Sequence, residues 1–205
     1  PGPYDQTYAS GISGVTSVVG ETDPSLPPKS FIISGISLSG NAGNILSITG
    51  RVVFVLSGDI EVKGSASISL NADSSVEIYT ANDVAIGGGG ITNTDGKATD
   101  FSVFGTAPMD GDDAGQDITI VGNGQLAATV YAPNADVSLN GGGTDGEVLG
   151  GVVALTATIT GGSAFHFDEA LRESDKDDGT YSVDSWLEMT GGPGDKNEPL
   201  DLTSH

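Results

Sequence analysis

Acidic side chains are the residues of this chain whose spacing most readily suggests chemistry, and they gather in two polar stretches. Hard cations such as Ca²⁺ take several carboxylate and carbonyl oxygens in a flexible loop, so each stretch is a candidate calcium site. The alternative is a pair of solvated loops, because neither stretch has the EF-hand spacing or the nonapeptide of calcium-binding β-rolls. The candidates are Asp110, Asp112, Asp113 and Asp117 in the first stretch, and Asp175, Asp177, Asp178 and Asp184 in the second.

A histidine beside two carboxylates forms a further candidate, made of His166, Asp168 and Glu169. An imidazole next to carboxylates can act as a general base or bind a metal. The other histidine is His205, and no serine lies in a Gly-x-Ser-x-Gly elbow. We therefore predict that His166 and its neighbours form a structural cap, which hydrogen-bonds the free backbone groups of the last repeat. We predict no catalytic residue and no organic cofactor.

Paired carboxylates on a repetitive β-structure also occur in enzymes that cleave polysaccharides. Such enzymes usually display basic and aromatic side chains in the groove that holds the sugar. Between Phe31 and Gly162 the basic residues are Arg51, Lys63 and Lys97. The single tryptophan, Trp186, lies outside that range. The sequence therefore predicts a protein that is not an enzyme, with carbohydrate binding or cleavage as the alternative.

Charge and composition exclude several classes of partner. The chain has 28 acidic and 7 basic residues and a formal charge of −21, which would repel nucleic acid and anionic lipid. It has no cysteine, so neither disulfides nor thiolate metal sites can form. No run of about 18 apolar residues predicts a membrane span. The chain begins Pro1-Gly2-Pro3 without an initiator methionine, which indicates a processed or trimmed fragment.

A turn–strand–glycine phrase recurs through the chain and predicts the architecture that carries these residues. Its terminal glycines are separated by 24, 24, 34, 19 and 20 residues. In each copy apolar and polar residues alternate, as in a strand with one buried side. The six copies are Gly35-Ile-Ser-Leu-Ser-Gly40, Asp59-Ile-Glu-Val-Lys-Gly64, Asp83-Val-Ala-Ile-Gly-Gly88, Asp117-Ile-Thr-Ile-Val-Gly122, Asp136-Val-Ser-Leu-Asn-Gly141 and Thr156-Ala-Thr-Ile-Thr-Gly161.

A period near 20 to 24 residues, built from strands without helices, is typical of a β-solenoid. We therefore predict an all-β fold, a parallel β-helix of about six coils that share one apolar core. Ile60 and Val62 should point inward, and Glu61 and Lys63 outward. An antiparallel sandwich is the competing architecture. An ice-binding solenoid ranks lowest, because Thr156, Thr158 and Thr160 do not extend into neighbouring copies.

The remaining segments flank or interrupt this solenoid. Residues 1–30 are rich in proline, which predicts an extended arm. We expect the solenoid over residues 31–162 and a cap with a polar tail over residues 163–205. We expect a protruding loop over Ile91–Asp117, a short capping helix over Ser163–Glu173 and a further strand over Tyr181–Glu188. Proline-rich or unpaired ends predict self-association through the arm or the solenoid ends.

Four phrases together are similar to a known family. They are Val130-Tyr-Ala-Pro-Asn-Ala-Asp-Val-Ser-Leu-Asn-Gly141, Gly150-Gly-Val-Val, Phe165-His-Phe-Asp-Glu-Ala-Leu171 and Val183-Asp-Ser-Trp-Leu-Glu188. They resemble a glycine-rich domain of uncharacterised function in prokaryotic surface proteins, often found after the pilin-like N-terminal helix of type IV pilus assembly proteins. The motif residues that carry the resemblance are Tyr131, Pro133, Asn134, Asp136, Gly141, His166, Asp168, Glu169 and Trp186.

The resemblance implies a right-handed parallel β-helix exported to the cell exterior, without established catalytic residues. With the residue-level reading, it predicts an extracellular structural or assembly module, a rod, spacer or adhesin at a prokaryotic cell surface. Its predicted partners are copies of itself, other surface proteins or glycans.

Overall fold

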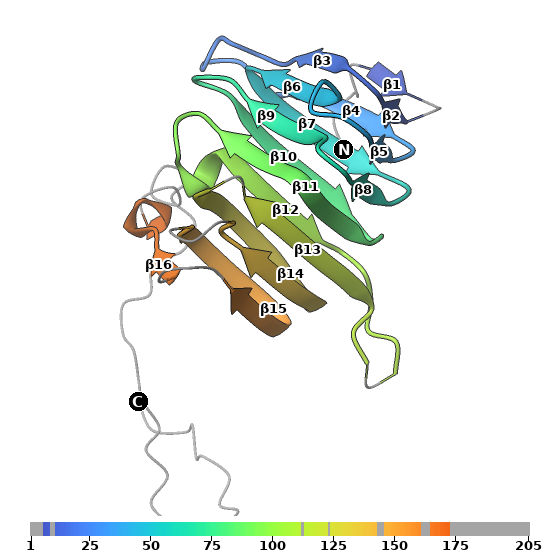
Figure 1. Cartoon of the computed structure of the whole chain (residues 1–205), viewed down its shortest axis with the longest axis vertical. Coiled ribbons are helices and arrows are strands. Elements are labelled where there is room, and N and C mark those ends of the chain that lie inside the picture. The colour runs from blue at the N-terminus through green and yellow to red at the C-terminus, as the bar shows by residue number, and fades with distance from the viewer. Residues whose placement is uncertain are drawn as a thin grey trace, which may run out of the picture.

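The chain folds as a parallel β-solenoid, in which each coil pairs with the next through in-register strands (Figure 1). The computed structural model describes residues 6–8, 11–111, 113–122, 124–142, 146–160 and 165–172. Every pairing between its strands is parallel, which excludes the antiparallel sandwich. No helix among these residues is long and apolar enough to cross a membrane.

Strands of successive coils stack into three faces. Face 1 contains β2 (Ile12–Ser13), β5 (Ile36–Leu38), β8 (Ile60–Val62), the start of β11 (Val84–Asn93), β13 (Gln116–Gly122) and the ends of β14 (Leu126–Asn140) and β15 (Val148–Thr160). Face 2 contains β3 (Thr16–Val19), β6 (Ile45–Thr49), β9 (Ser67–Leu70) and the end of β11. Face 3 contains β1 (Gln6–Tyr8), β4 (Lys29–Ile33), β7 (Arg51–Leu56), β10 (Ser75–Thr80), β12 (Phe101–Gly105), the starts of β14 and β15, and β16 (Phe165–Phe167).

The six copies of the repeated phrase lie side by side on face 1, as the sequence predicted. Their first apolar positions are direct register partners, in the order Ile36, Ile60, Val84, Ile118, Val137 and Ala157. In the first three copies, the glycine at the end of the copy turns the corner to face 2. Gly64 has a φ of +72°, and a Cβ there would lie 2.6 Å from the Gly40 carbonyl oxygen, so only glycine fits without strain.

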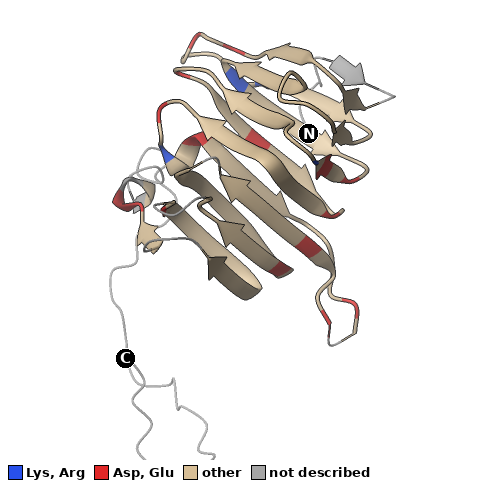
Figure 2. Ribbon diagram, viewed as in Figure 1, with Lys and Arg blue, Asp and Glu red and all other residues tan. Residues whose placement is uncertain are grey.

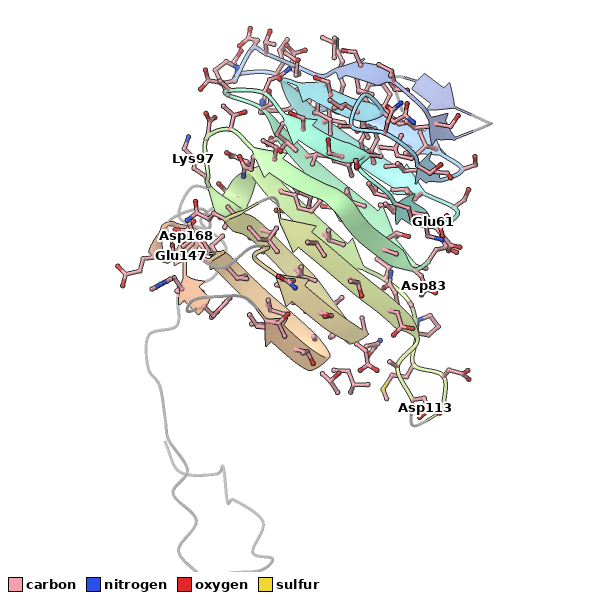
Figure 3. The ribbon with its side chains drawn as sticks, viewed as in Figure 1. Glu61, Asp83, Lys97, Asp113, Glu147 and Asp168 are labelled. Carbon is pink, nitrogen blue, oxygen red and sulfur yellow. The ribbon has the colours of Figure 1, made fainter. Side chains whose placement is uncertain are left out.

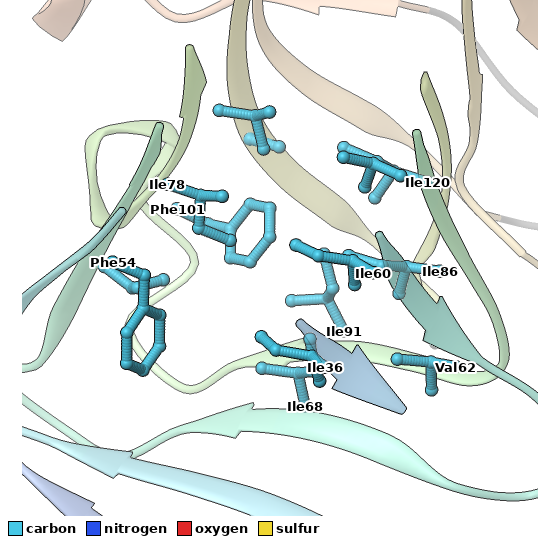
Figure 4. Packing of buried hydrophobic residues seen from close by; sticks show 14 of the residues in the cluster. Ile36, Phe54, Ile60, Val62, Ile68, Ile78, Ile86, Ile91, Phe101 and Ile120 are labelled. Carbon is cyan, nitrogen blue, oxygen red and sulfur yellow. The ribbon is translucent and has the colours of Figure 1, made fainter. Parts of the chain in front are cut away.

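The core is one continuous stack of apolar side chains that point inward from all three faces (Figure 4). Ile60, Val62, Val84 and Ile86 are each at most 1% exposed, whereas Glu61 lies outside. Val137 and Leu139 are also buried, so the predicted inward set is confirmed. On the face 3 side, the rings of Phe31 and Phe54 pack with centroids 5.8 Å apart. Each coil thus buries its apolar side chains against those of its neighbours.

The solenoid narrows along its axis from three faces to two. Within the described ranges, face 2 has no strand after Asn93. This loss explains why the register steps on face 1 shorten from 24 residues, between Ile36 and Ile60, to 19, between Ile118 and Val137. The intermediate step of 34 residues includes a protruding loop, residues 106–115 (Figure 1). The predicted loop over Ile91–Asp117 was too long, because β12 and parts of β11 and β13 lie in the ladders.

The first coil begins earlier than the sequence predicted. Residues 12–30 are not an extended arm, because β2 and β3 pair with β5 and β6. Ile12 and Val18 are buried, and the Arg51 guanidinium donates hydrogen bonds to the carbonyl oxygens of Asp23 and Leu26. Pro24, Pro27 and Pro28 lie in the connection between β3 and β4, where no ladder hydrogen bond is lost.

The predicted capping helix over Ser163–Glu173 is also corrected. Phe165–Phe167 forms β16, which pairs with Val148–Gly150, and only a 3₁₀ turn, η2 (Glu169–Arg172), follows it. A second such turn, η1 (Ala98–Asp100), precedes β12. The helical pattern of the sequence is overridden here because the free edge of β15 offers ladder hydrogen bonds to the segment that follows.

The inward ladder generates the first testable prediction. Ile86→Ala should lower the free energy of unfolding by about 2–5 kcal/mol, because it leaves a cavity in a core shared by neighbouring coils. Ala85→Ser, at the adjacent outward position, should change it by less than about 0.5 kcal/mol. Urea unfolding followed by circular dichroism measures both values. Equal effects of the two substitutions would contradict the assigned inward face.

Candidate functional site

The motif from Tyr131 to Gly141 forms the corner at which β14 passes from face 3 to face 1. The register with β15 shifts between Ala132 and Asp136, which marks the bend. At this bend Asn134 fixes the base of the protruding loop. Its side-chain amide donates to the Ala107 carbonyl oxygen at 3.0 Å, and its backbone carbonyl oxygen accepts from the Gly115 N–H at 2.9 Å. Pro133 is exposed and Gly141 buried. The motif therefore acts structurally, as a corner and a loop anchor.

The predicted acidic sites do not converge in the described part of the chain. Asp110 and Asp113 face each other across the tip of the protruding loop through two backbone hydrogen bonds, whereas Asp117 lies on β13. Figure 3 places Asp113 at that tip, far from Asp168 and Glu147 on the opposite edge. No group of three or more His, Asp or Glu side chains approaches metal-binding geometry among these residues. Asp112, Asp175, Asp177, Asp178 and Asp184 lie outside the described residues, as does Trp186.

A column of aspartates runs along the corner between faces 3 and 1, at the position that opens each repeat. Asp117 pairs in register with Asp136, and Asp136 pairs with Thr156. The Asp83 carboxylate accepts a hydrogen bond from the Asp117 N–H at 3.0 Å, and the Asp136 carboxylate accepts one from the Thr156 hydroxyl. These carboxylates satisfy polar groups of the following coil, which is a structural reason for aspartate at this position.

The histidine motif lies at the C-terminal end of the solenoid. His166 is exposed on β16, in register with Leu149, and Glu169 is exposed at the start of η2. Asp168 is partly buried and joins distant segments. Its N–H donates to the Gly150 carbonyl oxygen at 3.2 Å, and its carboxylate accepts from the Ala98 N–H at 3.3 Å. Through these two hydrogen bonds to backbone groups, Asp168 links β15 to η1 at the last coils of the solenoid.

A carboxyl group that the sequence did not single out, Asp100, sits in an unfavourable environment. One of its oxygens is buried and has no hydrogen-bond partner among the described residues. Burial raises the pKa of Asp100 above its ordinary value of 3.8, and the negative charges of Asp95 and Asp73 add to this, whereas the positive charge of Lys97 opposes it. Charged Asp100 therefore destabilises the fold.

The outward side of face 3 carries an apolar column that runs from β4 to β15. Its members, which we call the outer ladder, are register partners from coil to coil: Ile32, Val55, Tyr79, Phe104, Tyr131 and Val153. Sequence analysis missed this column. The sequence did carry a sign of the column, because each of its residues directly follows an inward apolar residue. Two apolar residues in a row, however, break the alternation of apolar and polar residues that normally marks a strand with one buried side.

Aromatic stacking joins the middle of the outer ladder. The rings of Tyr79 and Phe104 are nearly parallel, 10° apart in orientation, with centroids separated by 4.6 Å. The Tyr79 hydroxyl donates to the Glu77 carboxylate at 2.9 Å. Burial, followed by that hydrogen bond and the negative charge of Glu77, raises the pKa of Tyr79 to about 12. The tyrosine is therefore neutral at physiological pH, and its ring remains part of an uncharged surface.

Exposure of the outer ladder increases toward the C-terminal end. Tyr131 is 51% exposed, and Val153 is 48% exposed. Leu155 and Ile159 of β15 are also exposed. A groove of about 370 Å³ lies there, lined by Tyr131, Gly151, Val153, Ile159 and Phe165 among others. Charged residues lie chiefly on loops and strand ends, and few lie on the strands around this end (Figure 2). An uncovered apolar surface of this kind on an acidic protein indicates a contact site.

Residues 40–174 match the sequence model of a family described as a domain of unknown function, DUF7305. The chain belongs to the DUF7305 family. The match begins just after β5, in the second coil, and ends just after the turn that follows β16. Comparison with curated proteins and with solved structures gives no match. The outer ladder from Val55 onward, including its exposed end, lies within the matched residues, whereas Ile32 precedes them.

Asp100 provides a pH-dependent test of the local electrostatics. Because its folded-state pKa is raised, the folded protein holds more protons than the unfolded chain between pH 3.8 and that pKa, so stability falls as the pH rises through this window. Asp100→Asn should raise Tm at pH 7, and the gain should vanish below pH 3.8. Asp113→Asn, at the loop tip, is the control. Thermal melts that show a loss at pH 7 would contradict the account.

Proposed function

We propose that this DUF7305 domain is a non-catalytic structural module of a prokaryotic cell surface, a rigid spacer that docks against another protein through face 3. The outer ladder carries this proposal. It places apolar side chains on the solvent side of a regular sheet through six coils. Cross-strand stacking stabilises part of this column within the protein itself, as at Tyr79 and Phe104, whereas the exposed end at Tyr131 and Val153 is the kind of uncovered apolar surface that marks a contact site. A flat, in-register face is suited to contact with another surface along its length.

Rigidity supports the role of a spacer. Each coil is bonded to its neighbours by parallel ladders and shares their core, so bending would break many contacts at once. Parallel strands repeat about every 4.8 Å, which makes the solenoid a short rod. A rod of this kind holds the segments or partners attached to its two ends at a fixed distance.

Two observations support a place outside the cell. The chain has a charge of −21, which favours solubility in saline surroundings. Its phrases also resemble those of prokaryotic surface proteins, including pilus assembly proteins. Like charges keep copies apart at most faces, so contact should occur where charge is scarce, and the outer ladder itself contains no charged residue.

Carbohydrate binding is the second candidate, because the outer ladder contains three aromatic rings. Sugars stack on the exposed face of a ring, however, and Tyr79 and Phe104 turn their faces toward each other. Only Tyr131, at the exposed end of the aromatic series, has room for a sugar. The geometry therefore favours a protein partner over a glycan. Calcium binding at Asp110 and Asp113 stays a prediction.

Photo-cross-linking in the prokaryote that encodes the protein tests the docking proposal. A benzophenone amino acid in place of Tyr131 should yield adducts with another surface protein or a second copy. The same group in place of Thr119, an exposed residue of face 1, should yield several-fold less. Equal yields at the two positions, or adducts with glycan alone at position 131, would contradict the proposal. Release of sugar from a polysaccharide by the purified protein would contradict its non-catalytic part.

A further inference from the structure

The first strand of face 2, β3, is paired on one side only. Its neighbour is β6, with Thr16 opposite Leu46 and Val19 opposite Thr49. No described strand lies along its other side, and β3 marks the N-terminal end of the solenoid in Figure 1. A strand edge with unpaired backbone groups is a template for the addition of a further strand.

Alternate residues of β3 direct their backbone groups toward this free side. The Gly20 N–H donates to the Thr49 carbonyl oxygen, in line with β6, at 2.7 Å. Successive residues of a strand bond to opposite sides, so Ser17 and Val19 direct their N–H and C=O groups away from β6. These groups are the ones that an added strand would bond.

The outward side chains beside this edge form a pattern that reads the same in both directions. Val15 and Val19 are 76% and 57% exposed, and Ser17 lies exposed between them. If two copies pair antiparallel about a twofold axis at Ser17, each Ser17 lies opposite its counterpart and each Val15 lies opposite the partner's Val19. The edge is therefore complementary to itself, with apolar side chains opposite apolar ones.

Charge also permits two copies to meet at this edge. The chain carries −21, but no charged residue occurs from Gly11 to Gly20. The next residue, Glu21, is four positions from Ser17, and in the twofold register it lies opposite the partner's Ser13. Two chains that repel each other over most of their surface can therefore approach here without placing like charges opposite one another.

Head-to-tail stacking of two copies would leave this edge unpaired. Such stacking brings the last coils of one copy onto the first coil of the next. Within the described ranges, however, face 2 has no strand after Asn93, so the last coils offer nothing to pair with β3. The twofold arrangement places a face 2 strand against a face 2 strand, and it closes as a dimer.

We propose that a second copy of this chain pairs with β3 antiparallel across a twofold axis at Ser17, so that face 2 continues from one solenoid into the other. The dimer is a longer rod, with the two C-terminal ends pointing away from each other. This inference is independent of docking through face 3, because β3 lies on another face and at the opposite end from Tyr131 and Val153.

Sedimentation equilibrium of the full-length chain tests the dimer. The dissociation constant should be several-fold smaller in about 0.5 M than in about 0.05 M NaCl, because salt screens the repulsion between the acidic chains. Val19→Asp should raise it at least about tenfold, because each copy would then place a carboxylate against the partner's Val15. Thr119→Asp adds the same charge at an exposed position of face 1 and should leave it unchanged.

A cysteine variant keeps the test decisive if Val19→Asp disturbs the fold. The native chain has no cysteine, and opposed residues of an antiparallel pair lie within reach of a disulfide. Ser17→Cys should therefore form covalent dimers under mild oxidation, at concentrations where Thr119→Cys stays largely monomeric.

Three results would overturn the proposal. One is the mass of a single chain at every concentration and both salt levels. Another is equal cross-linking of Ser17→Cys and Thr119→Cys. The third is a dimer that Tyr131→Asp abolishes and Val19→Asp leaves intact, which would place the second copy on face 3.

Discussion

In-register stacking of parallel coils is the constraint on which every other feature of this protein depends. A strand of three to six residues buries one side only, and no coil has enough apolar side chains to form a core of its own. Stacking places Ile36, Ile60, Val84, Ile118 and Val137 in one column and buries all of them. The same register forces outward residues into columns too. The outer ladder of face 3 and the aspartate column at the corner are both consequences of this geometry.

Because each coil adds one residue to an outward column, a small solenoid can present a long, uniform strip of surface. On face 3 this surface is apolar and includes a stacked aromatic pair, on an otherwise strongly acidic chain. Stacking also creates a difficulty at the last coil, where ladder groups and inward side chains such as Ile159 have no following coil. The short β16 and the contacts of Asp168 relieve only part of it. Uncharged surface is therefore concentrated on face 3 and at the C-terminal end.

Sequence reasoning succeeded where a single short phrase carried the structural rule. Copies on face 1 begin with a small or acidic corner residue and alternate regularly, so their number, spacing and inward residues were predicted correctly. It failed where tertiary pairing overrides local preference. Prolines in the β3–β4 connection suggested an arm, although Ile12 and Val18 complete the first coil. The phrase around Asp168 has helical propensity, but the free edge of β15 draws Phe165–Phe167 into a strand. Face 3 was missed because its outward residues are apolar, which conceals the alternation.

Cross-linking of register partners tests the stacking most directly, and the absence of native cysteine makes the measurement clean. Ser37 and Glu61 are exposed register partners on consecutive coils of face 1, at a spacing compatible with a disulfide. The double variant Ser37→Cys with Glu61→Cys should form an intramolecular disulfide nearly completely under mild oxidation. Ser37→Cys with Lys63→Cys, offset by two positions, should form it far less. Equal yields for the two pairs, or none for the register pair, would contradict the parallel in-register solenoid.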